Sequence, residues 1–240
     1  MATFVIVHGA WSGGHAWRWL RPLLRAAGHE VFTPALTGLG ERSHLANAQI
    51  DLDTHVLDVV GVLEYEDLLQ VVLVGHSYGG VVITGVADRV PERLEQLVYL
   101  DAEVPMDGQS EFDLLPPEER AVYQESARSK GQGWRILPPV PEPLPDDLDA
   151  NLRWAMSRMV PQPVATFAQP LRLTNPAGLG VSRTYVLCTE GKEGQEVPSY
   201  VQRAQADPSW RFVELAAGHG AHVTAPQTLA DLLVGLVQPG

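Results

Sequence analysis

Short, fully apolar runs alternate with amphipathic segments along the first hundred residues of the chain. The runs cover residues 4–7, 71–74 and 97–100, and the segments 51–65 and 78–89 repeat apolar residues at helical spacing. An uninterrupted apolar run of this length is typical of a strand that is buried on both faces. The repeated strand–helix–strand order therefore predicts an α/β fold with a mostly parallel, twisted sheet flanked by helices.

This alternation stops between residues 105 and 180, where prolines gather. The same stretch contains two short helical segments, 118–129 and 146–159, and several large apolar side chains that need burial. Beyond it the strand–helix pattern resumes and continues almost to the end of the chain. We therefore expect one α/β core, formed by 1–104 and 181–240, with residues 105–180 inserted as a helical cap.

The charge balance of the chain excludes some classes of partner. Its 240 residues include 17 Lys and Arg against 29 Asp and Glu, which gives a formal net charge of −12. Such a charge repels nucleic acid and anionic membrane surfaces, and we expect neither as a partner. The single cysteine, Cys188, permits no internal disulfide, and no apolar run approaches the ~20 residues of a membrane span. With no basic leader before the first strand, we expect a cytoplasmic protein.

A five-residue motif, Gly75-His76-Ser77-Tyr78-Gly79, joins the predicted strand 71–74 to the predicted helix that follows it. A serine in such a sharp turn adopts a strained backbone, and the flanking glycines let strand and helix approach closely. Its hydroxyl then projects above the sheet at the positive end of the helix. This setting favours Ser77 as a catalytic nucleophile.

A serine hydroxyl needs a base, usually a histidine held by an acid. In folds with this serine turn the histidine follows the acid late in the chain, which selects the loop with His219 and His222. We favour His219, which directly follows a glycine after the last predicted strand, and expect His222 on the shoulder of the loop. We interpret His29, His44 and His55 as ordinary surface or core histidines.

An oxyanion hole is expected from the segment His8-Gly9-Ala10-Trp11, which follows the first buried strand. The backbone N–H groups of Ala10 and Tyr78 would point at the developing oxyanion, where each donor contributes ~3 kcal/mol. We expect His8 to hold this loop in place by a hydrogen bond and not to act as a base.

Four segments together resemble the α/β-hydrolase superfamily: 8–11, 37–42, 75–80 and 218–219. Within it they resemble the branch of plant methylsalicylate esterases, hydroxynitrile lyases and their bacterial esterase relatives. The resemblance covers nearly the whole chain and is weakest in the cap. It implies an α/β-hydrolase fold that hydrolyses small carboxylic esters through an acyl-enzyme. The implied residue roles match those given above for the nucleophile, base and oxyanion donors.

The third catalytic residue departs from this branch. The plant members resemble this chain at Cys188-Thr189-Glu190 but carry their acid where Gly191 stands here. A glycine cannot orient an imidazole, so the acid must come from elsewhere. Haloalkane dehalogenases place theirs after the strand that follows the serine turn, where this chain has Asp101. We favour Asp101; Glu190, then Glu103 or Glu193, and the absence of a working acid are the alternatives.

Other reactions lack the residues that they need. The hydroxynitrile lyases carry a threonine in place of Gly9 and a lysine in place of Gly220, which disfavours cyanohydrin cleavage. Dehalogenases and epoxide hydrolases need an aspartate where Ser77 stands. His219 and His222 have no nearby third metal ligand. We therefore expect neither a metal nor another cofactor.

The sequence thus predicts a serine hydrolase, carboxylesterase-like, for small and largely apolar esters. The side chains expected to border its pocket are Trp11, Tyr78, Trp134, Trp154, Met156, Met159 and Phe167. An apolar cap edge is compatible with a homodimer. Two alternatives stay open: a ligand-binding protein of the same fold with weak or no turnover, and a lyase on the same scaffold.

Overall fold

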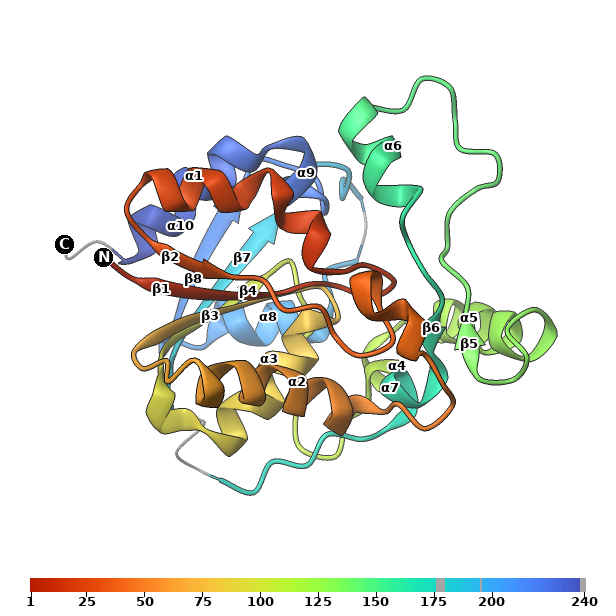
Figure 1. Cartoon of the computed structure of the whole chain (residues 1–240), viewed down its shortest axis with the longest axis horizontal. Coiled ribbons are helices and arrows are strands. Elements are labelled where there is room, and N and C mark those ends of the chain that lie inside the picture. Colours follow the sequence, from red (N-terminus) through yellow and green to blue (C-terminus); the bar gives the residue numbers. More distant parts are fainter. Residues whose placement is uncertain (176–179, 195, 238–240) are drawn as a thin grey trace.

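The computed structural model describes residues 1–175, 180–194 and 196–237. Its centre is a six-stranded sheet in the order β2-β1-β3-β4-β7-β8, and every strand pair in it is parallel (Figure 1). The strands are β1 (Thr3–Val7), β2 (Glu30–Phe32), β3 (Val71–His76), β4 (Leu94–Leu100), β7 (Ser182–Cys188) and β8 (Trp210–Leu215). The predicted parallel α/β architecture is confirmed.

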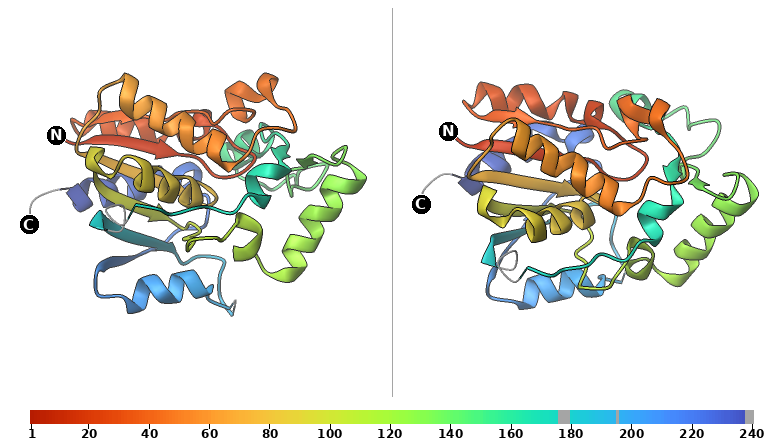
Figure 2. Two further views of the ribbon diagram at one scale, coloured as in Figure 1. Left: turned by 90° about the horizontal axis from the view of Figure 1, so that it is seen from below. Right: turned by 60° about the horizontal axis from the view of Figure 1, so that its bottom comes forward.

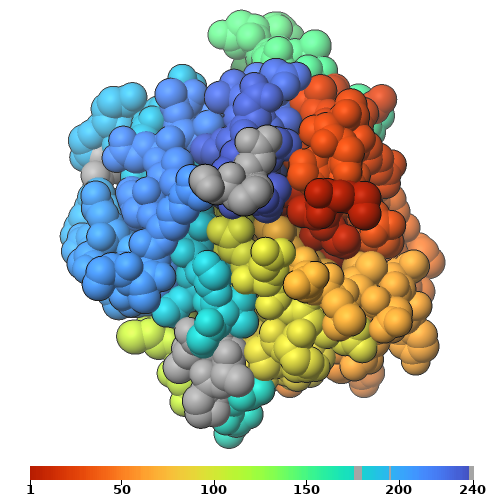
Figure 3. Space-filling model, turned by 90° about the vertical axis from the view of Figure 1, so that its left-hand side faces the viewer, coloured from red at the N-terminus to blue at the C-terminus, as the bar shows by residue number. Residues whose placement is uncertain are grey.

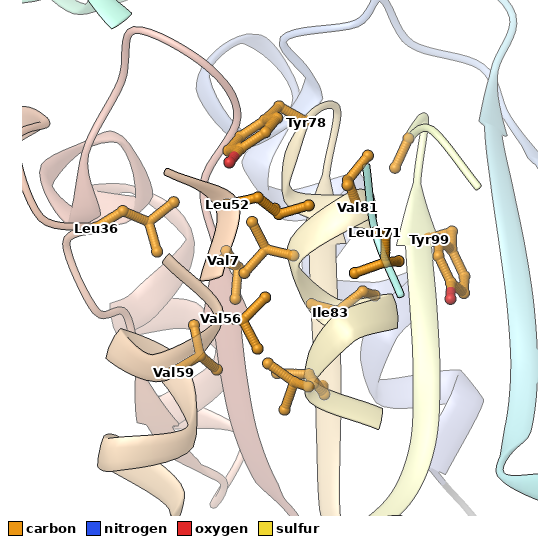
Figure 4. Close-up of a cluster of buried hydrophobic side chains, with 14 of the residues drawn as sticks. Val7, Leu36, Leu52, Val56, Val59, Tyr78, Val81, Ile83, Tyr99 and Leu171 are labelled. Atoms are coloured by element: carbon orange, nitrogen blue, oxygen red, sulfur yellow. The ribbon is translucent and has the colours of Figure 1, made fainter. Parts of the chain in front are cut away.

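Two hydrophobic clusters lie on opposite faces of this sheet. Side chains alternate along β1, so that Val5 and Val7 join one cluster and Phe4 and Ile6 join the other. Helices α2 (Leu52–Tyr65), α3 (Gly79–Arg89) and α8 (Ser199–Ala206) cover the first face, part of which Figure 4 shows. Helices α1 (Leu20–Ala26) and α10 (Pro226–Val237) cover the second.

The boundaries of α2 agree with the sequence expectation, and those of α6 do not. Asp51 begins α2 with a capping box, accepting from the Thr54 N–H at 2.9 Å. The segment expected as a helix over 146–159 contains only α6 (Ala150–Met156), because Asp149 caps it by accepting from two backbone N–H groups. Several short helices were not predicted: η1 (Gly14–Arg18), η2 (Gly40–Leu45), η3 (Pro91–Arg93), α4 (Glu111–Leu114), α7 (Val164–Ala168), α8 and α9 (Ala221–Thr224).

Most of the inserted segment, from α4 to α7, lies beyond the carboxyl ends of the strands, and the chain after α7 runs back past the end of α3, where Thr174 and Asn175 bind Asp88 (Figures 1 and 2). The segment contains α4, α5 (Pro117–Ser129), α6, α7 and an antiparallel pair of two-residue strands, β5 (Arg135–Ile136) and β6 (Gln162–Pro163). The N-terminus and the end of α10 lie at the opposite end of the sheet (Figure 3). Within the described ranges no helix has the length and apolar character needed to cross a membrane.

Candidate active site

Ser77 stands in a sharp turn between β3 and α3. Its φ is +53°, a left-handed conformation that is strained for a residue with a side chain. A Cβ on Gly75 would lie 2.5 Å from the carbonyl oxygen of Gly79, and a Cβ on Gly79 would lie 2.8 Å from that of Val7. Both glycines are therefore needed for strand and helix to meet this closely. The turn leaves Ser77 half-buried, within reach of a ligand.

The loop after β1 packs directly against this serine. A Cβ on Gly9 would lie 3.0 Å from the Ser77 Cβ. His8 holds the loop: its Nε2 accepts from the Leu36 N–H at 3.1 Å, so its Nδ1 carries the proton and donates to the Gly9 oxygen at 2.8 Å. Burial lowers the pKa of His8 to about 4. His8 therefore fixes the loop as a neutral side chain.

The amides of Ala10 and Tyr78 flank Ser77 on two different elements. Both residues are buried, and neither backbone N–H has a hydrogen-bond acceptor among the described residues. Buried amides are almost always paired within the protein or with a ligand or water. The Tyr78 side chain makes contacts of its own: its hydroxyl donates to His55 Nδ1 at 3.0 Å, and its ring stacks on Phe167.

Asp101 and His219 are brought together from distant parts of the chain. His219 Nδ1 lies 2.7 Å from Asp101 Oδ2. The other carboxylate oxygen accepts from the Cys188 N–H at 3.2 Å and from the ammonium group of Lys192. His219 is half-exposed and the Asp101 side chain is only 2% exposed. The imidazole is therefore accessible to a ligand, while the carboxylate that it contacts is buried.

The backbone fixes Asp101 at the end of β4. Its φ is +47°, and its N–H donates to the Val186 oxygen on the neighbouring strand at 2.8 Å. Burial alone would raise the pKa of its carboxyl, but the hydrogen bonds and charges of His219 and Lys192 outweigh this and hold the pKa below its ordinary value. Asp101 is therefore ionised at neutral pH.

The alternative acids lie elsewhere. Glu190 and Glu193 are exposed, and no contact of either with His219 occurs in the described part of the chain. The charge of His219 acts on the pKa of the Glu103 carboxyl, but no hydrogen bond joins the two, and the buried Oε2 of Glu103 has no hydrogen-bond partner among the described residues. Among the carboxyl groups considered from the sequence, only Asp101 contacts the imidazole.

Two further histidines surround His219. His76 Nε2 donates to the His219 carbonyl oxygen at 2.8 Å and thus supports the loop that carries it. His222 is buried against Trp17 and His76, and burial lowers its pKa to about 3. No contact between His222 and Asp101 appears among the described residues. No hydrogen bond joins Ser77 Oγ to His219 there either; such contacts often tighten only when substrate binds.

Trp11 connects the loop beside Ser77 to the inserted residues 105–180. Its N–H donates to Gln162 Oε1 at 3.0 Å, its indole N–H donates to the Ile136 oxygen at 3.1 Å, and its carbonyl oxygen accepts from Val160. Gln162 is fully buried and also donates to Thr166 Oγ1 at 2.7 Å. The position of this loop therefore depends on the inserted segment.

The other expected pocket residues separate into two groups. Phe167 lies at the centre of an aromatic cluster with Trp11, Tyr78, Phe112 and Tyr123. The contacts described for the remaining side chains involve neither Ser77 nor His219. The guanidinium groups of Arg18 and Arg158 both lie over the Trp154 ring, and that of Arg135 lies over the Trp134 ring. Met156 and Met159 line a groove on the inserted segment.

The sequence reasoning did not include Lys192, Gln162 or the support given by His76. Lys192 directly follows Gly191, where the resemblance places an acid. A lysine at this place could have indicated that it pairs with a carboxylate from another segment. Gln162 carried no sign, because a lone glutamine among prolines is common. Among the described residues no cluster of His, Cys, Asp and Glu is arranged to hold a metal ion.

The sequence profile of the Alpha/beta hydrolase family matches residues 4–232. The chain belongs to this family. This α/β hydrolase is 41% identical over 244 residues to a carbendazim hydrolyzing esterase of Nocardioides sp. (strain SG-4G), with 98% of this chain and all of the relative covered. It is 27% identical to salicylic acid-binding protein 2 of Nicotiana tabacum, covering 96% and 95% of the two chains.

A solved structure of an α/β-hydrolase has the same fold as this chain. The extracellular α/β-hydrolase from a Paenibacillus species superimposes with a TM-score of 0.82 at 26% identity, and 98% of each chain is covered. Together with the plant methylesterases among its relatives, these similarities assign the chain to the methylesterase branch, with bacterial esterases as relatives. The hydrolase is therefore a carboxylesterase-like enzyme, as predicted from its sequence.

Proposed function

We propose that this hydrolase cleaves small carboxylic esters with Ser77 as nucleophile, His219 as base and Asp101 as the acid that orients the base. The observation that carries the proposal is the 2.7 Å contact between His219 Nδ1 and the buried carboxylate of Asp101. An imidazole held in this way keeps its proton on Nδ1, which leaves Nε2 free to accept another. Ser77 offers that proton from the turn after β3.

The reaction follows from these positions. His219 Nε2 takes the Ser77 hydroxyl proton as Oγ attacks the ester carbonyl carbon, and the carbonyl oxygen becomes an oxyanion. The free N–H groups of Ala10 and Tyr78 stabilise that oxyanion, each by ~3 kcal/mol. The intermediate expels the alcohol, which receives the proton from His219. Water, deprotonated by the same imidazole, then hydrolyses the acyl-Ser77 ester and releases the acid.

We assign the inserted segment the role of a cap over this site; of the expected range 105–180, residues 176–179 lie outside the described residues. Leu152 of α6 lies 3.9 Å from the position of a Cβ on Gly220, next to His219, and Val160 and Gln162 bind Trp11 on the other side of Ser77. The aromatic cluster around Phe167 supplies an apolar wall, which suits small and largely apolar esters. Because a 41% identical relative is a carbendazim hydrolyzing esterase, carbendazim is a candidate substrate.

Turnover of p-nitrophenyl acetate, p-nitrophenyl butyrate and carbendazim by the wild type and by Ser77→Ala tests this function. We expect the wild type to hydrolyse at least the p-nitrophenyl esters, and Ser77→Ala to lose about 10³-fold or more in kcat. Thr189→Ala, a hydroxyl removed elsewhere at the same end of the sheet, serves as the matched control. Turnover that survives Ser77→Ala contradicts the proposal.

A further inference from the structure

A cavity lies between the second half of α3, β4 and the chain segment that follows α7. Its volume is about 170 Å³, and Ser77, Asp101 and His219 are not among the residues that line it. An apolar cavity of ~150 Å³ in a protein is large enough to hold one benzene molecule. This cavity therefore has room for a single aromatic ring with a small substituent, at a place that the proposed ester hydrolysis does not use.

The cavity has a buried floor and reaches the protein surface. Ala87 of α3 and Tyr99 of β4, the latter labelled in Figure 4, line it and are only 3% and 2% exposed. Arg183 and Trp210 also line it and are half-buried, and Thr174, a further lining residue, is exposed. A small molecule can therefore enter from solvent and bury its apolar part against the floor.

Two aromatic side chains supply flat walls. The ring centroids of Tyr99 and Trp210 are 5.2 Å apart, with 41° between the ring planes. The Tyr99 hydroxyl donates to Thr84 Oγ1 at 2.9 Å, because that oxygen donates its own proton to the Gly80 carbonyl oxygen at 2.7 Å. Burial raises the pKa of Tyr99 to about 12, so this side chain stays neutral at physiological pH. The two rings thus offer uncharged aromatic surface to a planar ligand.

Arg183 brings a positive charge to the cavity without an acidic partner. Its guanidinium lies 4.7 Å from the Trp210 ring centroid and donates to Ser209 Oγ at 3.2 Å. No carboxylate forms an ion pair with it in the described ranges of the chain, although acids outnumber bases by 29 to 17. A guanidinium has five N–H donors in a planar fork that matches a carboxylate. The donors that Ser209 does not use are available for the carboxylate of a ligand.

The acidic side chain on the cavity wall, Asp88, is satisfied by other groups. Its Oδ1 accepts from the N–H groups of Thr174 and Asn175 at 2.8 and 2.7 Å, and its Oδ2 accepts from the Thr174 hydroxyl at 3.3 Å. Hydrogen bonds from N–H groups stabilise a carboxylate and offset part of its charge. Asp88 therefore holds the segment after α7 against α3 and leaves Arg183 unpaired.

We propose that this cavity is a second ligand site, which binds a small aromatic carboxylate of the size of benzoate. The ring of the ligand lies against Tyr99 and Trp210, and its carboxylate pairs with the Arg183 guanidinium. An ion pair at a half-exposed arginine contributes little by itself, and so does a single ring in so small a cavity. Binding therefore needs the ring and the charge together.

Calorimetry with benzoate, benzyl alcohol and acetate separates these two contributions. Benzyl alcohol keeps the ring without the charge, and acetate keeps the carboxylate without the ring. We expect the wild type to bind benzoate with a Kd on the order of 1 mM, since a ligand of so few atoms binds weakly. Each of the other two compounds should bind at least about tenfold more weakly.

Two variants of the cavity wall show where benzoate binds. Arg183→Met removes the charge and keeps an unbranched apolar stem, and it should weaken benzoate binding at least about tenfold. Ala87→Leu fills the floor of the cavity without changing Arg183 and should abolish binding. Arg211→Met, which removes an exposed arginine next to Trp210, is the matched control and should bind benzoate like the wild type. Esterase turnover should stay at the wild-type rate in all three variants.

Other results overturn the inference. Benzoate that binds equally to the wild type, Arg183→Met and Ala87→Leu occupies a different site. Absence of benzoate binding by the wild type, or equal affinity for benzoate and benzyl alcohol, rejects carboxylate recognition in this cavity. The catalytic proposal is tested separately: if Ser77→Ala keeps its esterase activity while benzoate binding still depends on Arg183, that proposal fails and this one stands.

Discussion

His219 Nδ1 lies 2.7 Å from Asp101 Oδ2, although 118 residues separate them along the chain. The carboxylate stands at the end of β4, and the loop after β7 contributes Lys192 to its second oxygen. A cation therefore occupies the loop in which related plant enzymes carry their acid. In the proposed mechanism the acid is Asp101, at the end of the neighbouring strand, and Lys192 helps to hold its carboxylate.

The role of Asp101 predicts a large effect of a small change. Asp101→Asn keeps the shape of the side chain but removes the charge that stabilises imidazolium, so kcat for p-nitrophenyl butyrate should fall at least about 100-fold. Glu190→Gln, the matched change in the exposed alternative, should retain the wild-type rate. A full rate in Asp101→Asn combined with a loss in Glu190→Gln would show that Glu190 is the acid.

Lys192 should set the pH range of activity. Its ammonium group lowers the pKa of Asp101 and competes with protonated His219 for the same carboxylate. In Lys192→Met the imidazolium form of His219 faces an uncompensated negative charge, so the acidic limb of kcat/KM should move to higher pH. Lys192→Arg should stay near the wild-type profile. An unchanged profile in Lys192→Met would contradict this role.

Gln162 should affect catalysis through Trp11. Gln162→Leu removes the acceptor for the Trp11 N–H and the donor to Thr166, which should cost about 1–3 kcal/mol in the free energy of unfolding and lower kcat about tenfold. Gln169→Leu is the control, because it removes comparable hydrogen bonds between the cap and Asp53 and none to Trp11. If both variants lose kcat equally, the effect is general loosening of the cap.

Buried neutral histidines predict acid sensitivity of folding. The pKa of His222 is about 3 in the folded protein, against about 6.5 when exposed, so below pH 6.5 the unfolded chain binds a proton that the folded chain does not. This contribution makes the free energy of unfolding fall as pH falls. His222→Gln should reduce the slope by about 1.4 kcal/mol per pH unit between pH 5.5 and 4, measured by urea unfolding. A variant slope equal to that of the wild type would contradict the shift.

The sequence was sufficient for features that local chemistry determines. Fully apolar runs fix buried parallel strands, and the glycines around Ser77 fix a turn that no other residue allows. The expectation for Asp101 came from its place at a strand end, where parallel strands meet at one edge of the sheet. Contacts between distant segments could not be predicted from the sequence. The hydrogen bonds between Lys192 and Asp101 and between Gln162 and Trp11 depend on how loops fold in three dimensions.

The cap was the least predictable part for a related reason. Large apolar side chains there need burial, but periodicity cannot say against which surface. Trp154 contacts the guanidinium groups of two arginines, and an aromatic cluster forms around Phe167. The buried carboxyl of Glu111 had no counterpart in the sequence pattern, since an acid near a helix start is usually exposed.

The most direct test of the central claim is to locate the covalent intermediate. A fluorophosphonate that reacts with activated serines should add one label per chain, and peptide mass spectrometry should find it on Ser77 and nowhere else. Labelling should disappear in Ser77→Ala and slow strongly in Asp101→Asn, in parallel with esterase activity. A label on another residue, or esterase turnover in a protein whose Ser77 remains unlabelled, would contradict the proposed mechanism.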